Sequence, residues 1–211
     1  MSDQILHPAV SGNRWVTQIQ RYPVIATTHL RLRPFVLSDI SALVNPVTRQ
    51  RIASTTLAVP YPFDTRQARR WIESHARAWQ DGSAAHWAIS ALDDDRLVGY
   101  VGLHDIDNRK ERAELSLWVA ERSERKEFGI EAAEAALAFA FTDLQLGRVQ
   151  ACQLAGNPLL ARILRRIGMK AEITVLRTLC RWGRSDDGWV WSIDHADWMN
   201  SLQAAAAEAT D

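Results

Sequence analysis

Cysteine is scarce in this chain, with only Cys152 and Cys180 among 211 residues. Two thiols so far apart in sequence exclude a disulfide framework or a zinc cluster. We interpret them as reduced, buried thiols of a cytoplasmic protein. An excess of charge of either sign is also lacking, because 25 Lys and Arg balance 25 Asp and Glu. A neutral chain has no general attraction for nucleic acid or for an anionic membrane, so we expect neither as a partner.

Long apolar runs are missing as well. No stretch approaches the roughly 20 apolar residues that a membrane-spanning helix needs. The first residues, MSDQILHPAVSG, lack the basic region and apolar run of a signal peptide. No internal repeat or linker divides the chain. We therefore expect one domain over residues 24–198, an irregular N-terminal arm over residues 1–23, and a flexible C-terminal tail over residues 199–211.

The strongest structural pattern lies in residues 112–137. Over residues 112–119 apolar and polar side chains alternate, which predicts a strand with two different faces. One face carries Ala113, Leu115, Leu117 and Val119, and the other carries Glu114, Ser116 and Trp118. A charged turn follows, and then a segment rich in good helix formers. The free N–H groups and the dipole at the start of such a helix attract a phosphate.

Similar patterns predict the remaining elements. Strands are expected at residues 29–35, 86–92, 96–103, 148–155, 169–181 and 188–193, and helices at residues 40–44, 65–82 and 157–168. This order predicts a mixed, mainly antiparallel twisted sheet of about seven strands flanked by about four helices. The fold class is α+β, an α/β sandwich, and the order excludes a doubly wound parallel sheet.

Several stretches also carry a resemblance to a known family. They are LRLRPF followed by SDISALV, then VPYPFDTRQARRWIE, GYVGL, AELSLWV and NPLLARILRRIGM. In this order they resemble the GNAT superfamily of acetyl-CoA-dependent N-acetyltransferases, and within it the ribosomal-protein alanine N-acetyltransferase type. The resemblance spans roughly residues 29–193. It implies a GNAT-like fold and acetyl transfer from acetyl-CoA, as co-substrate and without a metal, to a primary amine. The amine is that of a protein N-terminus or a small molecule, and it attacks directly in a ternary complex.

The pyrophosphate loop of that family reads Gln or Arg, two residues, Gly, one residue, then Gly or Ala. The matching positions here, which the resemblance assigns to cofactor binding, are Glu124, Arg125, Lys126, Glu127, Phe128 and Gly129. Only the last glycine fits, so the loop is degenerate. Each glutamate adds negative charge beside a dianion, at a cost on the order of 1–4 kcal/mol, which Arg125 and Lys126 could offset. Alternatively, the two glutamates are first-turn acids that complement the helix dipole.

The late helix holds two further cofactor candidates. The resemblance implies that Asn157 contacts the coenzyme and that Arg162 reaches one of its phosphates. The alternatives are a helix cap for Asn157 and a solvated helix face for Arg162. Leu160 stands where the family often has a serine that protonates the leaving thiolate, and leucine has no proton to give.

The central strand supplies the candidate chemistry. The resemblance implies that the coenzyme lies along Trp118 and Val119, where a backbone N–H polarises the thioester carbonyl. Glu114 is the candidate general base, since similar enzymes carry Glu there, and its alternative is an ion pair with Arg112 or another arginine. His104 titrates in the right range for catalysis, and its alternative is an ordinary loop histidine.

Two other functions remain open at this stage. Glu127 and Leu160 alter two positions that the chemistry uses, so the domain could have lost catalysis and act as a binding or interaction module. A homodimeric scaffold is the other possibility, because Trp182, Trp189 and Trp191 could form an exposed aromatic patch.

Overall fold

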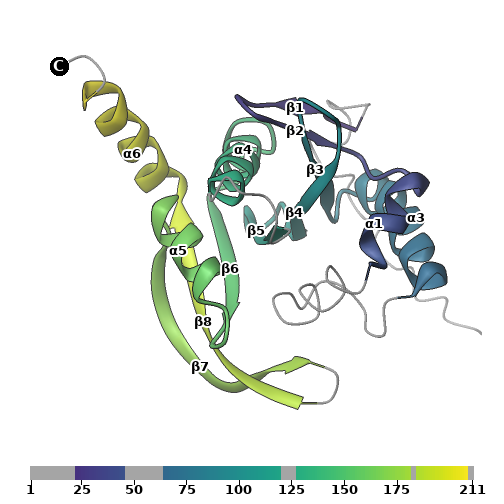
Figure 1. The fold of residues 1–211 in the computed structure, drawn as a ribbon. Coiled ribbons are helices and arrows are strands. Elements are labelled where there is room, and N and C mark those ends of the chain that lie inside the picture. The colour runs from purple at the N-terminus through teal and green to yellow at the C-terminus, as the bar shows by residue number, and fades with distance from the viewer. Residues whose placement is uncertain (1–21, 46–63, 120–126, 182–183, 209–211) are drawn as a thin grey trace, which may run out of the picture.

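One eight-stranded sheet organises the protein. The computed structural model describes residues 22–45, 64–119, 127–181 and 184–208 (Figure 1). The strands are β1 (Ile25–Ala26), β2 (Leu30–Arg33), β3 (Ala85–Ala91), β4 (Leu97–Asp107), β5 (Arg112–Val119), β6 (Arg148–Leu154), β7 (Lys170–Arg181) and β8 (Arg184–Asp194). Their order is β1-β2-β3-β4-β5-β6-β8-β7. All neighbours are antiparallel except β5 and β6, so the expected mixed, mainly antiparallel sheet is confirmed.

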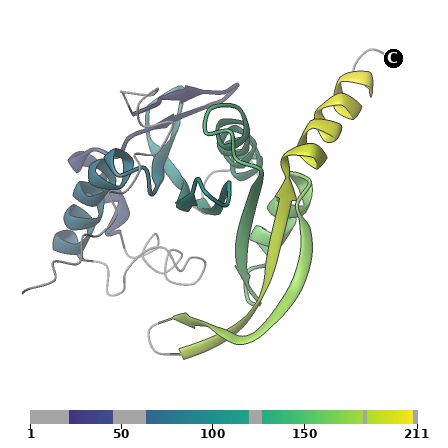
Figure 2. The same cartoon turned by 180° about the vertical axis from the view of Figure 1, so that it is seen from behind.

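The described residues form five α-helices, of which the last projects away from the sheet (Figure 1). They are α1 (Ile40–Leu43), which follows the short 3-10 helix η1 (Leu37–Asp39), then α3 (Thr65–Gln80), α4 (Phe128–Thr142), α5 (Pro158–Arg166) and α6 (His195–Glu208). The sheet curves around α4, while α1 and α3 lie together on its outer side (Figures 1 and 2). No helix in the described ranges is long and apolar enough to cross a bilayer.

Local sequence sets the ends of α3, which was expected over residues 65–82 and spans Thr65–Gln80. Asp64 is its N-cap and accepts a hydrogen bond from the Gln67 backbone N–H at 2.8 Å. Gln67 Oε1 accepts one from the Asp64 N–H at 2.9 Å, which completes a capping box. Gly82 follows the helix with a φ of 68°, a conformation that glycine adopts without strain.

The predicted alternation of β5 is confirmed by the two cores. Leu115, Leu117 and Val119 belong to the larger core with the buried alanines of α4. Trp118 belongs to the smaller core, where it joins Tyr100 and apolar residues of α1 and α3. Glu114 and Ser116 therefore face the same side of the sheet as Trp118.

Two elements go beyond the sequence-based expectation. The strand β1 was not predicted, because two residues are too few to show an alternating pattern. The tail expected to be flexible from residue 199 instead continues α6 to Glu208, and alanine, the best helix former, dominates it. With these elements the described chain has eight strands and five α-helices rather than about seven and four.

Trp191 does not belong to the exposed aromatic patch that was one possibility near the last hairpin. Trp191 is only 6% exposed, and its indole N–H donates to Gln153 Oε1 at 2.9 Å. Trp189 is half-buried, and Trp182 lies outside the described residues. The register of β8 on β6 turns Trp191 into the core, which sequence spacing alone could not reveal.

Candidate active site

The two central strands part halfway along their length. The parallel strands β5 and β6 pair only from Arg112 with Arg148 to Glu114 with Gln150. Beyond that point β5 continues to Val119 along β4, and β6 continues along β8. In the described chain no β5–β6 pair follows Glu114, so an opening exists within an otherwise continuous sheet.

A pocket with about 250 Å³ of open space lies at this opening. It is lined by Leu117, Trp118 and Val119 of β5 and by Asn157, Leu159, Leu160 and Ile163 of α5. Of the cofactor candidates, Trp118, Val119 and Asn157 thus come together at one pocket. Leu160, which replaces the expected proton donor, lines it too.

The N-terminus of α4 packs against the same pocket. A Cβ on Gly129 would lie 2.6 Å from Ile163 Cδ1 and 3.1 Å from Val119 Cγ2. The missing side chain of Gly129 therefore leaves room for the first turn of α4 to approach both β5 and α5, where a Cβ would push the tip of Ile163 aside. The approach brings the positive end of the helix dipole to the edge of the pocket.

Glu127 is the N-cap residue of α4 by position, but its side chain does not cap the helix. It is exposed, and its side chain accepts no hydrogen bond from the first N–H groups of the helix. Glu131 is the acidic residue in the first turn of α4. Its carboxylate accepts hydrogen bonds from Thr27 Oγ1 at 2.6 Å and from the His29 N–H at 2.7 Å. Phe128 is buried in the larger core. Residues 124–126 of the expected loop, which carry Glu124, Arg125 and Lys126, lie outside the described residues.

Asn157 has the structural role that was its alternative reading. Its Oδ1 accepts a hydrogen bond from the Leu160 N–H at 3.0 Å and so caps α5. Gln153 Nε2 donates to the Asn157 carbonyl at 3.1 Å, and Trp191 in turn holds Gln153. These buried hydrogen bonds fix the start of α5 beside the pocket.

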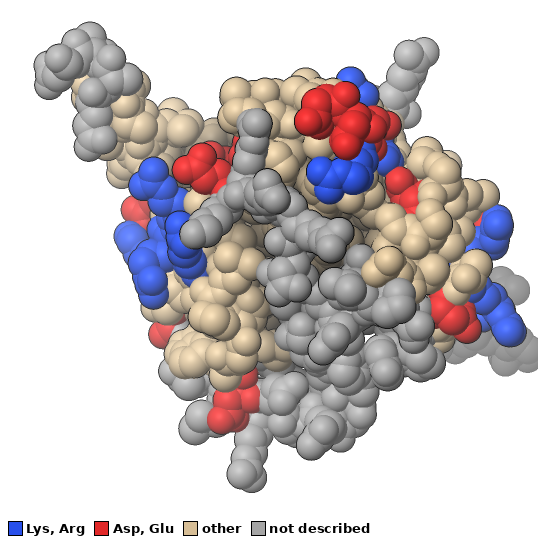
Figure 3. Space-filling model, viewed as in Figure 1, with Lys and Arg blue, Asp and Glu red and all other residues tan. Residues whose placement is uncertain are grey.

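Arg162 is exposed on α5. Figure 3 shows basic side chains gathered over the part of the surface where α5 lies in Figure 1. Arg165 and Arg166 of the same helix are also exposed, and Arg165 lies over the Trp191 ring at 5.8 Å. The solvated-face reading of Arg162 therefore fits the structure, and the surface around it is positively charged.

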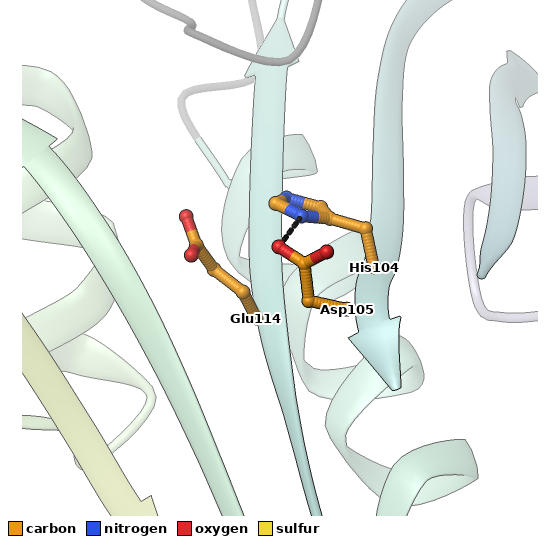
Figure 4. Close-up of side chains that lie close together, drawn as sticks. All are labelled: His104, Asp105 and Glu114. Carbon is orange, nitrogen blue, oxygen red and sulfur yellow. Dashed lines mark hydrogen bonds and ion pairs between the residues drawn. The ribbon is translucent and has the colours of Figure 1, made fainter. Parts of the chain in front are cut away.

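Glu114 and His104 are brought together at the point where the strands part. They are direct partners in the β4–β5 register, and the ligand atoms of His104, Asp105 and Glu114 lie within 4.8 Å of one another (Figure 4). Asp105, at a φ of 51° in an irregular stretch of β4, approaches His104 Nδ1 at 3.4 Å. Among the described residues, Glu114 forms no ion pair with an arginine, contrary to its alternative reading.

Cys152 reaches Glu114 from the opposite strand, β6. Burial, followed by the charge of the Glu114 carboxylate and a hydrogen bond to it, raises the pKa of the Cys152 thiol to about 12. The thiol therefore stays protonated at neutral pH and gives up its proton poorly. Glu114 thus lies between His104 on one side and Cys152 on the other.

Sequence reasoning missed a polar chain beside Glu114. His86 Nδ1 lies 2.9 Å from the Tyr100 hydroxyl, which lies 3.2 Å from Ser116 Oγ. The alternation of β5 had placed Ser116 on the face of Glu114 without giving it a role. Tyr100 and His86 reach it only through the register of three strands, for which the sequence carries no local signal.

Comparisons with known proteins agree with this geometry. A family model described as the acetyltransferase (GNAT) domain matches residues 29–170. The uncharacterized N-acetyltransferase YoaA of Bacillus subtilis (strain 168) is 23% identical over 172 residues, which cover 82% of this chain and 97% of YoaA.

Two solved structures share the fold. RimJ of Mycobacterium smegmatis, in complex with CoA-disulfide, is 17% identical with a TM-score of 0.70, over 82% of this chain and 89% of RimJ. The ribosomal-protein-S5-alanine acetyltransferase of Vibrio fischeri is 17% identical with a TM-score of 0.71, over 83% of this chain and 98% of that one.

Proposed function

This chain belongs to the GNAT acetyltransferase family, and from that premise we propose that it transfers an acetyl group from acetyl-CoA to a primary amine. The observation that carries the proposal is the parting of β5 and β6 beyond Glu114, with a pocket at the gap and the N-terminus of α4 beside it. An open sheet edge, an apolar channel and a positive helix end suit a thioester, its pantetheine arm and its diphosphate.

In this proposal the coenzyme lies between β5 and α5. Its pantetheine arm contacts Trp118, Val119 and Asn157, and the Val119 region polarises the thioester carbonyl through backbone N–H groups. The diphosphate takes the first-turn N–H groups of α4 beside Gly129. Further contacts are assigned to residues 124–128 and to the exposed Arg162 near the basic surface of α5.

Glu114 is the proposed general base, and His104 assists from the neighbouring strand. The amine nitrogen attacks the thioester carbon, the C–N bond forms, and the C–S bond breaks. Glu114 accepts the proton that the nitrogen loses, and coenzyme A leaves as a thiol after gaining one proton. Leu160 has no proton to give and Cys152 holds its own, so that proton comes from Glu114 or from water.

The proposed acceptor class is supported by the chemistry of the opening and by one relative. The Glu114 carboxylate lies where β5 and β6 stop pairing, so it can accept a proton from an amine at the end of a peptide chain or on a small molecule. The relative from Vibrio fischeri is named for acetylating the alanine of a ribosomal protein. We therefore propose the N-terminus of a protein, or a small primary amine, as the acceptor, and place the reaction in the cytoplasm, where acetyl-CoA and reduced thiols occur together.

The test is acetyl transfer to a panel of peptides with free N-termini and of small amines. Wild-type protein is expected to acetylate at least one of them, and Glu114→Gln is expected to lose about 10²–10⁴-fold in kcat. Glu111→Gln, an exposed acid in the turn before β5, is the matched control and is expected to keep full activity. Transfer that is equal in wild type and Glu114→Gln would remove Glu114 from the mechanism.

Two observations favour a second function. Leu160 lines the pocket where a proton donor is expected, and exposed Glu127 precedes the helix that would bind the diphosphate. A binding or interaction module would bind acetyl-CoA, or a partner, without transferring the acetyl group. Calorimetric titration with acetyl-CoA, run beside the transfer assay, distinguishes the two. Heat of binding without transfer to any amine in the panel would favour the module.

We expect no metal to take part in the reaction. His104, Asp105 and Glu114 are close enough to hold a cation, so this expectation needs its own test. Transfer after dialysis against EDTA should proceed at the untreated rate. A rate that falls after dialysis and returns with added zinc would show that the cluster binds a working metal.

A further inference from the structure

Three polar side chains on adjacent strands form a hydrogen-bonded chain that the proposed acetyl transfer leaves unused. His86 comes from β3, Tyr100 from β4 and Ser116 from β5, and successive atoms lie 2.9 and 3.2 Å apart. Tyr100 is fully buried, whereas Ser116 is half-buried. His86, at the other end, is half-buried as well, so only the middle member of the chain is shut off from solvent.

The strand geometry makes room for this chain. Gly102 is the register partner of both His86 and Ser116. A Cβ at Gly102 would collide with the Tyr100 hydroxyl and would lie 3.0 Å from His86 Nδ1. Glycine weakens a strand, and here its missing side chain leaves the space that the Tyr100 hydroxyl occupies.

The direction of the protons along the chain follows from basicity. Burial raises the pKa of Tyr100 and lowers that of His86 to about 4, so at neutral pH the phenol is protonated and the imidazole is neutral. An imidazole nitrogen is a stronger acceptor than a serine hydroxyl, and its contact with Tyr100 is the shorter of the two. We assign His86 the tautomer with its proton on Nε2, so that Tyr100 donates to His86 Nδ1 and Ser116 donates to Tyr100. Ser116 Oγ then has only lone pairs left for a ligand.

A second acceptor lies beside Ser116. Glu114 is two residues away on the same face of β5. The negative charge of Glu114 is one of the causes that raise the Tyr100 pKa, so its carboxylate lies within electrostatic reach of Tyr100, the middle member of this chain. The opening thus carries two neighbouring acceptors, a carboxylate and a hydroxyl oxygen, between His104 and Trp118.

We propose that Ser116 Oγ and the Glu114 carboxylate hold the acceptor amine by its two N–H groups, and that Tyr100 and His86 are positioning residues that keep Ser116 an acceptor. The inference rests on the acetyl transfer proposed above. A neutral primary amine has two N–H bonds and one lone pair, so both hydrogens are bound while the lone pair attacks the thioester. A secondary amine has one N–H and leaves one acceptor without a partner. Ser116 thereby selects primary amines against N-methylated ones.

The experiment compares an acceptor peptide with the same peptide carrying an N-methylated N-terminus. Wild type is expected to prefer the primary amine in kcat/KM. Ser116→Ala should lower kcat/KM for the primary amine about tenfold, mainly through KM, and should change the value for the N-methyl peptide much less. Ser116→Thr keeps the hydroxyl and should restore the preference. Ser41→Ala, at an exposed serine of α1, is the matched control.

Tyr100→Phe tests whether Tyr100 positions Ser116. It is expected to reduce the preference in the same direction as Ser116→Ala while acetyl-CoA affinity, measured by calorimetry, stays at the wild-type value. A Ser116→Ala variant that loses activity equally on both peptides, or loses none, would overturn this inference and leave acetyl transfer intact. Wild type without transfer to any amine would overturn both.

Discussion

At the scale of single residues, buried histidines are the most consequential side chains outside the opening. His75 is 5% exposed, and neither of its ring nitrogens has a hydrogen-bond partner in the described part of the chain. Its ring stacks on that of His86 and packs edge-on against that of Trp71, and in both pairs the ring centroids are 4.3 Å apart. Burial, and next the charge of His86, lowers the pKa of His75 to about 2.

These lowered pKa values predict acid sensitivity. In the unfolded chain both histidines bind a proton below about pH 6.5, whereas in the folded protein His86 does so only near pH 4 and His75 near pH 2. Their contribution to stability is therefore complete above pH 6.5 and is lost as the pH falls below it, by up to about 1.4 kcal/mol per pH unit for each histidine.

Urea denaturation at pH 6.0 and pH 4.5 measures this loss. His75→Phe keeps an aromatic ring without a titrating group, so its free energy of unfolding should fall less steeply over this interval than that of wild type. The interval from pH 6.0 to pH 4.5 lies at or above the ordinary pKa values of Asp and Glu, so most carboxylates stay charged throughout the comparison. Identical slopes in wild type and variant would show that His75 is protonated in the folded protein.

Glu127 gives a second prediction at this scale. An exposed carboxylate about 4 Å from a phosphate in water costs roughly 1 kcal/mol, so Glu127→Gln should tighten acetyl-CoA binding about fivefold. The gain should shrink in 0.5 M salt, because salt screens exposed charges. Asp93→Asn, at an exposed acid in a distant turn, is the control. Calorimetry that gives equal or weaker binding for Glu127→Gln would contradict the charge argument.

At the scale of elements, the junction of α4, α5 and β5 holds the opening in shape. Gly129 permits the contact, and Ile163 and Val119 fill the space that a side chain would take. The sequence had indicated Gly129 only as a coenzyme contact. The structure adds a packing role, which can be measured without any ligand.

Gly129→Ala should destabilise the protein by about 1–3 kcal/mol, because its methyl group would meet Ile163 Cδ1. Ile163→Val removes that carbon at a cost of about 0.5–1.5 kcal/mol. Together the two changes should cost clearly less than their sum. Additive free energies of unfolding in this double-mutant cycle would mean that α4 does not press on α5 at this point.

The same elements show what the sequence could predict. The alternation in β5 and the helix expected over residues 65–82 depend on neighbours in sequence, and both are confirmed by the structure, in which α3 spans Thr65–Gln80. The chain from His86 to Ser116 depends on the register of β3, β4 and β5, which no local pattern encodes. The hydrogen bond from Trp191 to Gln153 also joins residues far apart in sequence. Sequence spacing alone therefore left open an exposed position for Trp191, which the structure contradicts.

At the scale of the whole molecule, the proposed coenzyme site depends on the division of the sheet into two parts. Strands β1 to β5 form one part and β6, β8 and β7 the other, and they share only the short pairing that ends at Glu114 and Gln150. Helix α4 packs inside the curve of the first part, and α5 packs on the second (Figure 1). A homodimer remains an expectation, and light scattering at high concentration tests it independently of the site.

The most direct measurement of the central claim is a crystal structure of the protein with coenzyme A. The account predicts electron density for the pantetheine arm between β5 and α5, along Trp118 and Val119, with the diphosphate against the first turn of α4 beside Gly129. Density for the coenzyme on any other surface, or a diphosphate turned away from α4 into solvent, would contradict it.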